Sequence, residues 1–235
     1  MSSSYPVAGS SFRVMAPFEQ ARFTREAWGQ LLRLRTAGVL GGPELEQVIE
    51  RINADDELYA LWLAANVNAV ERLGMTDHGP VHVKIVMNIA TKLLRVLTEH
   101  GVQPGVVVNY GMGTDDAEVV VVLAALLHDV GMSIHRKDHE EFSLFVSQMK
   151  LRELLEGIYP CGQATIIRSE ILHAIIGHRA GGKPMTIEGG VVRVADALDM
   201  AKGRSRIAME AEGPMMSIHS ISAAAIEAVH IESGV

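Results

Sequence analysis

The sequence predicts an all-α protein, and three observations lead to that class. Its 235 residues are 48% hydrophobic but only 5% aromatic, a composition that favours an aliphatic, mainly helical core. Apolar residues recur at intervals of three and four over most of the chain, which is the spacing of a helix face. No convincing alternation of apolar and polar residues, typical of a half-buried strand, occurs before Pro214. We therefore expect a helical bundle with an N-terminal helical extension and a short C-terminal tail of strand-forming character.

Residues 1–75 are predicted to form the N-terminal helical extension. A first helix begins near Pro17, after a Ser- and Gly-rich start, and Gly41-Gly42-Pro43 ends it. A second helix starts behind Pro43, because proline is well tolerated in a first turn. A third helix is expected from Asp55 to Leu73. Its apolar face consists of Leu58, Leu61, Trp62, Ala65 and Ala69.

Residues 76–210 are predicted to form the main helical domain. A helix runs from Pro80 to about His100, and residues 101–113 are expected to be a loop. The core stripe of that helix is predicted to be Val81, Ile85, Ile89, Leu93 and Leu97. Thr114-Asp115-Asp116 should cap the next helix, which delivers His128 and is stopped by Gly131.

Three more helices are expected, followed by the tail. The helices cover residues 138–156, residues 163–177 and a segment that begins after Gly189-Gly190. Residues 211–235 are the tail, and the β-branched residues near its end predict a strand. A chain that stops just after such a segment is consistent with the start of a truncated small domain.

Composition and charge exclude several classes of function. A formal charge of -7 disfavours binding of a nucleic-acid polymer and fits a small phosphorylated substrate better. The single Cys161 cannot form an internal disulfide, and the first residues lack the layout of a secretory signal. The apolar run 119–127 is far shorter than the roughly 20 residues of a membrane span. We therefore expect a cytoplasmic protein that does not bind a membrane.

The most informative motif is the dipeptide His128-Asp129 at the end of that apolar run. A helix so apolar should not end in two ionisable groups without a partner such as a metal. Other histidines and carboxylates follow in an ordered series, H…HD…H…H…D, each within a helical pattern. With this series the chain resembles the HD-domain superfamily of metal-dependent phosphohydrolases, from about Thr76 to Arg206. The resemblance implies an HD-domain helical bundle over residues 76–210.

The resemblance also implies a ligand set. The core metal ligands of the superfamily correspond to His82, His128, Asp129 and Asp196. Members with two metals add histidines, which match His139 and His178 here, and Asp129 would then bridge the ions. The pattern around His178 and Asp196 is similar to small HD hydrolases that split diadenosine tetraphosphate. Imidazole and carboxylate ligands suit divalent iron, manganese, cobalt or zinc, so we expect a divalent transition metal, as two ions.

Two other histidines are alternatives to members of this set. His78 lies one helical turn before His82, but the spacing and the following valine favour His82. His173 lies outside the matched spacing and is expected to pack near the site or to contact substrate. Asp199, three residues after Asp196, should lie near the same helix face and orient a ligand or an arginine.

Basic residues beside the ligands are the candidates for binding phosphate. Arginine suits bidentate contact with phosphate, which favours Arg136, Arg179 and Arg204 over neighbouring lysines such as Lys137 and Lys183. The doublet is not followed by the I-G-K of the cyclic-di-nucleotide phosphodiesterase branch, and that branch's G-Y-P signature is missing. Arg136 or Lys137 would then replace the missing lysine at the scissile phosphate.

The function predicted from these observations is metal-dependent hydrolysis of a phosphomonoester or phosphoanhydride in a nucleotide or small metabolite. Asp129, Arg136 and Lys137 are the predicted catalytic residues, and a metal-bound hydroxide is the expected nucleophile. Two alternatives remain: a di-iron oxygenase with the same ligands, and a regulatory module that binds a nucleotide without turnover. The N-terminal amphipathic helices also offer a surface for a homo-oligomer.

Overall fold

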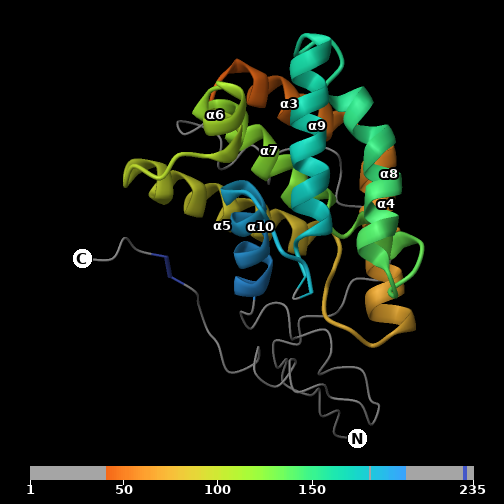
Figure 1. The fold of residues 1–235 in the computed structure, drawn as a ribbon. Helices are drawn as coiled ribbons and strands as arrows, with labels where there is room; N and C mark the ends of the chain where they lie inside the picture. Colours follow the sequence, from red (N-terminus) through yellow and green to blue (C-terminus); the bar gives the residue numbers. More distant parts are fainter. Residues whose placement is uncertain (1–40, 180, 200–229, 232–235) are drawn as a thin grey trace, which may run out of the picture.

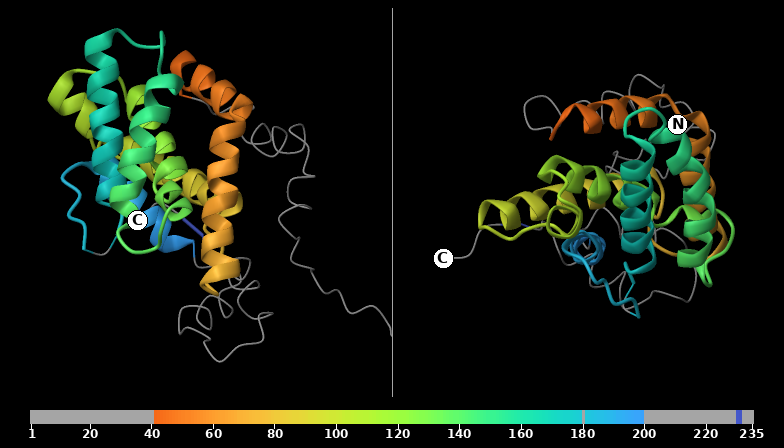
Figure 2. Two further views of the ribbon diagram at one scale, coloured as in Figure 1. Left: turned by 90° about the vertical axis from the view of Figure 1, so that its right-hand side faces the viewer. Right: turned by 45° about the horizontal axis from the view of Figure 1, so that its top comes forward.

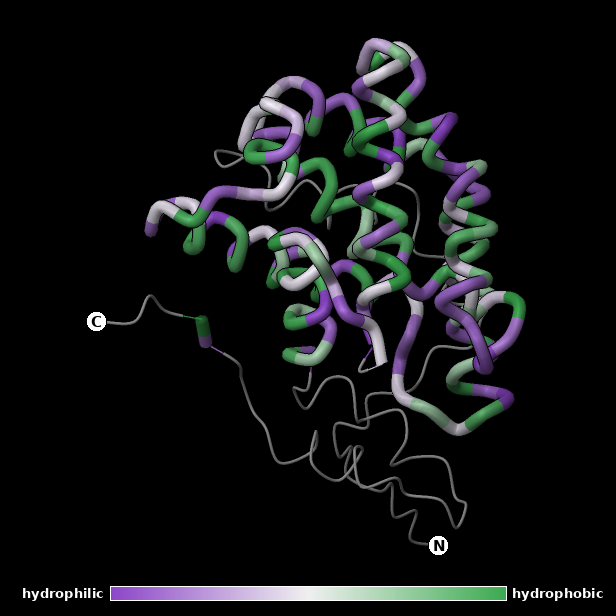
Figure 3. The backbone as a smooth tube through the Cα atoms, in the orientation of Figure 1, coloured by the Kyte–Doolittle hydropathy of each residue, from purple (hydrophilic) through white to green (hydrophobic). Residues whose placement is uncertain are grey.

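Helix α7 (Thr114–Leu127), which is buried beyond its first turn, lies at the centre of the fold (Figure 1). The computed structural model describes residues 41–179, 181–199 and 230–231, and this part of the chain is helical, without strands. Every residue of α7 from Ala117 to Leu127 is buried, as expected of a helix that is apolar on all sides. Figure 3 shows this hydrophobic run inside the bundle. The prediction of an all-α fold is confirmed.

The described part of the N-terminal extension packs along one side of the bundle (Figure 2). It consists of α3 (Pro43–Ala54), α4 (Asp56–Asn66) and a π-helical turn, η1 (Val67–Arg72). Asp55 caps α4 by accepting a hydrogen bond from the Leu58 N–H at 2.8 Å. Trp62 is buried and donates its indole N–H to the Leu126 carbonyl at 2.8 Å. This bond joins α4 to the end of α7, just before the His128-Asp129 doublet.

Helix α5 (Pro80–Glu99) begins where predicted, but its core stripe differs from the prediction. Val81 is 60% exposed and Ile85 is 36% exposed, whereas the neighbouring Val83 and Val86 are fully buried. The buried face comprises Pro80, His82, Val83, Val86, Met87, Ala90 and Leu94. Two adjacent apolar stripes run along α5, and periodicity alone does not tell which one faces α7 and α10.

The predicted loop over residues 101–113 is wrong, because it contains the short helix α6 (Gly105–Tyr110). The first N–H groups of α6 donate hydrogen bonds to a residue that is distant in the sequence. The fully buried carboxylate of Glu188 accepts hydrogen bonds from the N–H groups of Gly105 at 2.9 Å and Val106 at 3.0 Å. This tertiary cap stabilises a helix too short to be stable alone.

The glycines expected to precede the last helix lie inside it. Helix α10 spans Ile187–Leu198 and includes Gly189 and Gly190, and the side chain of Thr186 caps it. A Cβ at Gly189 would lie 3.0 Å from the Cβ of Pro184. Glycine therefore permits a close approach between α10 and the preceding loop, rather than a break in the helix.

The remaining helices follow the predicted order. Helix α7 ends at Leu127, before Gly131, and a 3₁₀ turn, η2 (Val130–Ser133), follows the doublet. Helices α8 (His139–Leu154) and α9 (Cys161–Ile176) then pack against each other. The helix predicted at Pro17 and nearly all of the predicted strand lie outside the described residues. No helix in the described part of the chain has both the length and the apolar character of a membrane span.

Candidate metal centre

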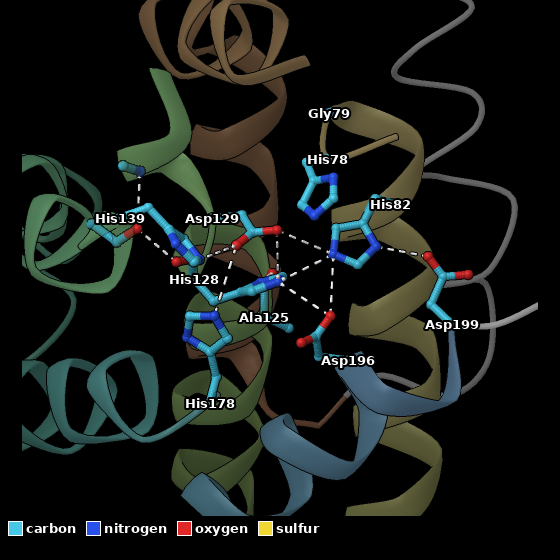
Figure 4. Close-up of polar contacts among 12 residues, drawn as sticks. His78, Gly79, His82, Ala125, His128, Asp129, His139, His178, Asp196 and Asp199 are labelled. Atoms are coloured by element: carbon cyan, nitrogen blue, oxygen red, sulfur yellow. Dashed lines mark hydrogen bonds and ion pairs between the residues drawn. The ribbon is translucent and has the colours of Figure 1, made fainter. Parts of the chain in front are cut away.

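The six predicted metal ligands converge at one end of α7 (Figure 4). His82 lies in the first turn of α5, and Asp196 lies in the last turn of α10. The other four ligands lie at helix ends: His128 caps α7, Asp129 follows it, His139 begins α8 and His178 follows α9. The bundle therefore brings together side chains that are up to 114 residues apart in the sequence. Each of them lies within or beside a helix.

Asp129 lies in the middle of this cluster, and its two oxygens face different histidines. Oδ2 lies 3.3 Å from Nε2 of both His82 and His128. Oδ1 lies 3.1 Å from Nε2 of His139 and 3.8 Å from Nε2 of His178. On the Oδ2 side, Asp196 Oδ1 lies 3.4 Å from His82 Nε2 and 3.8 Å from His128 Nε2. One carboxylate thus lies between two groups of donor atoms, as a bridging ligand would.

The histidine rings are held through Nδ1, so that Nε2 points into the centre. His82 Nδ1 lies 2.7 Å from Asp199 Oδ2, and Asp199 is itself buried. His128 Nδ1 lies 2.8 Å from the Ala125 carbonyl, and His178 Nδ1 lies 2.6 Å from the Ile175 carbonyl. These oxygens only accept hydrogen bonds, so in each case Nδ1 donates and Nε2 carries a lone pair.

His139 has a more polar surrounding than the other three histidines. Its Nδ1 lies 3.1 Å from two acceptors, the Arg136 carbonyl and Oε2 of Glu140. Nη1 of Arg136 lies 2.9 Å from the same nitrogen. This contact places a guanidinium directly behind a candidate metal ligand.

The arrangement fits a divalent metal. His82 Nε2 and His128 Nε2 are only 3.2 Å apart, although each ring donates from Nδ1. Two ring nitrogens that face each other this closely in a buried site need a proton or a metal cation between them, and the neighbouring Asp129 and Asp196 favour positive charge there by raising the pKa of His128 against the effect of burial. Ligand histidines commonly donate their other ring nitrogen to a carboxylate or a carbonyl, as these do. Among the described residues, two groups have donor atoms close enough to share an ion, namely His82 with His128 and Asp196, and His128 with Asp129 and His178. His139 belongs to neither group, although its Nε2 lies 3.1 Å from Asp129 Oδ1.

The charges of the cluster also suit a cation. Burial raises the pKa of Asp129, but His128 and the other histidines outweigh it and hold this pKa well below its usual range. The pKa of Asp196 is lowered in the same way, by His82 and His128. Burial and the neighbouring His128 lower the pKa of His178 to about 4. At neutral pH the site therefore offers two carboxylates and a neutral His178, which are the metal-binding forms.

The two alternative histidines lie outside both groups. His78 is buried in the turn before α5, where its Nδ1 lies 2.7 Å from the Thr76 carbonyl. His173 accepts a hydrogen bond from the Met185 N–H at 2.9 Å and so fastens the loop before α10. Asp199 was expected to orient a ligand or an arginine, and its carboxylate lies 2.7 Å from Nδ1 of the candidate ligand His82.

A cavity of about 630 Å³, which we call the basic pocket, adjoins the cluster through the contact between Arg136 and His139. Among the described residues its lining includes one carboxylate, Asp138, and four cations: Arg72, Arg136, Lys137 and Arg179. Three of these residues were candidates for binding phosphate, whereas Arg72 was not predicted. Lys183 is exposed in the loop between α9 and α10 and does not line this pocket. Arg204 lies outside the described residues.

The residues that hold the candidate ligands in place belong to no sequence motif. The Ser143 hydroxyl donates to the His128 carbonyl at 2.6 Å and accepts from the Gly131 N–H at 2.9 Å. Through these bonds α8 holds the backbone on both sides of Asp129. The i, i+3 spacing of Asp196 and Asp199 was the one local signal for such a residue.

The segment that bears the six candidate ligands matches a known family. The family model described as HD domain matches residues 81–201, and that of a protein of unknown function, DUF494, matches residues 2–60. The chain is 42% identical over 170 residues to an uncharacterized protein, MJ1020, from Methanocaldococcus jannaschii. The match covers 72% of this chain and 65% of that relative, so it spans just under two thirds of the relative's length. No solved structure matches the chain.

Proposed function

Because the chain belongs to the HD-domain family, whose members are generally metal-dependent phosphohydrolases, we propose that it hydrolyses a phosphomonoester or phosphoanhydride of a nucleotide or small metabolite. The observation that carries this proposal is the position of Asp129. Its two oxygens face two separate groups of histidines, as a carboxylate shared by two metal ions requires. His82, His128 and Asp196 would hold one ion. Asp129 and His178 would hold the other, with His139 as a further ligand beside Asp129 Oδ1.

A divalent transition metal bound by these residues would supply a water of near-neutral pKa and neutralise charge on phosphoryl oxygens. The chain itself contributes orientation and charge. Asp129 and Asp196 stay ionised because the histidines lower their pKa values. The side chain of Asp196 is 25% exposed, whereas that of Asp129 is 4% exposed, so Asp196 is the more accessible of the two carboxylates.

The basic pocket supports a phosphorylated substrate. Arg136 contacts Nδ1 of His139, on the side of the ring that faces away from Asp129, so the guanidinium adjoins the candidate metal centre from the pocket side. Lys137 and Arg179 line the same cavity and add positive charge. This concentration of cations in an acidic protein suits an anionic substrate, as the hydrolysis of a phosphate compound requires.

The experiment that tests the proposal measures metal and phosphate release together. Protein purified without chelator is analysed by elemental mass spectrometry and assayed for phosphate release from a panel of phosphorylated metabolites. We expect about two metal ions per chain and turnover of at least one compound. Asp129→Asn should lose both, while the exposed Glu141→Gln on α8 should retain both. Full turnover by the Asp129 variant would refute the proposal, and oxygen consumption by iron-loaded protein without phosphate release would favour the oxygenase.

A further inference from the structure

The basic pocket contains a cation, Arg72, that comes from the N-terminal extension rather than from the helices that bear the metal ligands. Arg72 ends the π-helical turn η1, and its Nη1 donates to Asn68 Oδ1 at 2.7 Å. The amide of Asn68 in turn donates to the Met132 carbonyl at 2.7 Å and to the Ser133 carbonyl at 3.0 Å. Both carbonyls belong to η2, the turn that directly follows Asp129.

Arg72 is therefore a positioned arginine, although its side chain is exposed. Asn68 is buried and bonded on both sides, so it cannot turn away without losing its bonds to η2. An exposed arginine normally loses much conformational freedom when it binds an anion. Here one of its nitrogens is held in advance, and the rest of the planar guanidinium remains available for bidentate binding.

The distribution of charge distinguishes Arg72 from the other two arginines of the pocket. Arg179 pairs with Glu140 at 2.7 Å, and Arg136 contacts His139 of the metal centre. Arg72 instead has a neutral amide as its hydrogen-bond partner. Arg136 and Arg179 already have these partners, which leaves the charges of Arg72 and Lys137 for an anionic group. Of these two side chains, Arg72 is the one that a hydrogen bond holds in advance.

Two exposed apolar side chains line the same pocket. Leu73 is 51% exposed and Ile134 is 48% exposed, and each follows directly from a turn that shapes the cavity, η1 or η2. Apolar surface beside a cluster of cations suits an organic phosphate better than an inorganic one.

We propose that Arg72 binds a second phosphoryl group of the substrate, so that the substrate class is organic compounds with two or more linked phosphoryl groups. This inference rests on the proposed function, because it assigns the part of that substrate which lies away from the metal centre. It also gives the N-terminal extension a direct role in substrate recognition.

The test compares two probes that differ by one phosphoryl group and are not hydrolysed, orthophosphate and methylenediphosphonate. Their dissociation constants are measured by titration calorimetry with metal-loaded protein, and metal content is checked after each titration. Arg72→Ala should weaken binding of methylenediphosphonate at least tenfold and that of orthophosphate less than threefold. The affinity of Arg72→Lys for methylenediphosphonate should lie between those of wild type and Arg72→Ala, since lysine keeps the positive charge but lacks the paired N–H donors of a guanidinium.

The control is Arg152→Ala, an exposed arginine in the last turn of α8 that does not line the pocket. It should bind both probes as the wild type does. Equal effects of Arg72→Ala on the two probes, or no effect, would overturn the inference even if the protein hydrolyses a phosphate ester. A selective loss of methylenediphosphonate binding in a protein without turnover would support the subsite and refute the hydrolase.

Discussion

Replacing Gly131 with alanine should separate the two halves of the site, because this glycine lies against the first turn of α8. A Cβ at Gly131 would lie closer than 3.0 Å to three backbone atoms: the carbonyl oxygen of His139, the nitrogen of Ser143 and the carbonyl carbon of Phe142. Ordinary contact begins at 3.4 Å. Since all three atoms are backbone, no side-chain rotation relieves the overlap, and the start of α8 must move away by roughly an ångström.

The cost follows from two effects. Overpacking of a core costs about 1–3 kcal/mol and occasionally more, and here helix backbone must move. The shift also strains the two hydrogen bonds of Ser143, whose buried partners cost about 1–3 kcal/mol each when left unsatisfied. We therefore expect Gly131→Ala to lower the free energy of unfolding by about 3–5 kcal/mol. His139 moves with α8, so metal on its side of Asp129 should be lost first.

The assay is urea unfolding followed by circular dichroism, with metal content measured on the same preparations. The matched control is Gly190→Ala in α10, where an added Cβ meets nothing within 4 Å. That change should stabilise the protein by about 0.5–1 kcal/mol, as expected for alanine in a helix interior. A Gly131→Ala variant within 1 kcal/mol of wild type, with unchanged metal content, would show that the approach of α8 does not position the site.

Three other changes have expected outcomes. Asp199→Asn should weaken metal binding about 10–100-fold in competition with a chelator, because it disturbs the group that orients His82; unchanged affinity would contradict this role. Trp62→Phe should lower the free energy of unfolding by about 1–3 kcal/mol, since it leaves the buried Leu126 carbonyl without its donor; urea titration measures it, and a neutral effect would argue against the bond. Lys150→Met should cost about 2–4 kcal/mol at pH 7, because the lysine lies within 2.8 Å of three carboxylates that the change leaves without their cation. Burial lowers the pKa of Lys150, but those carboxylates outweigh it and raise this pKa above the value of 10.5 in the unfolded chain. The contribution of Lys150 to the free energy of unfolding should therefore be complete below pH 10.5 and decline at higher pH. A difference in stability between variant and wild type that stays constant above pH 10.5 would contradict this linkage.

Much of the site was predictable because each ligand lies in a local pattern. The run 119–127 has no charged residue and ends in His128-Asp129, and that conflict between burial and charge is visible without coordinates. The place of Asp199 was predictable from its spacing with Asp196 on one helix. The roles of the six proposed ligands stay predictions until metal is measured, although the fold brings them together.

What could not be predicted depends on tertiary contacts. Helix α6 owes its N-terminal bonds to Glu188, more than 80 residues later. The orientation of α5 is set by its contacts with α7 and α10, not by its period. Arg72 belongs to no sequence motif, and Asn68 directs it to the pocket. The partners of Asn68 are main-chain carbonyls, which any residue could supply, so the sequence does not reveal them. Local patterns therefore identify ligands more readily than the residues that bind substrate.

The burial of α7 on every side has a consequence for the protein once it unfolds. Val119 to Leu127 are nine consecutive apolar residues, four of them β-branched valines, and the native bundle covers all of them. In an unfolded chain this segment has the features of a β-aggregating stretch, with high β-propensity and neither charge nor proline. Heating should therefore end in irreversible precipitation, and the apparent melting temperature should rise with faster scans.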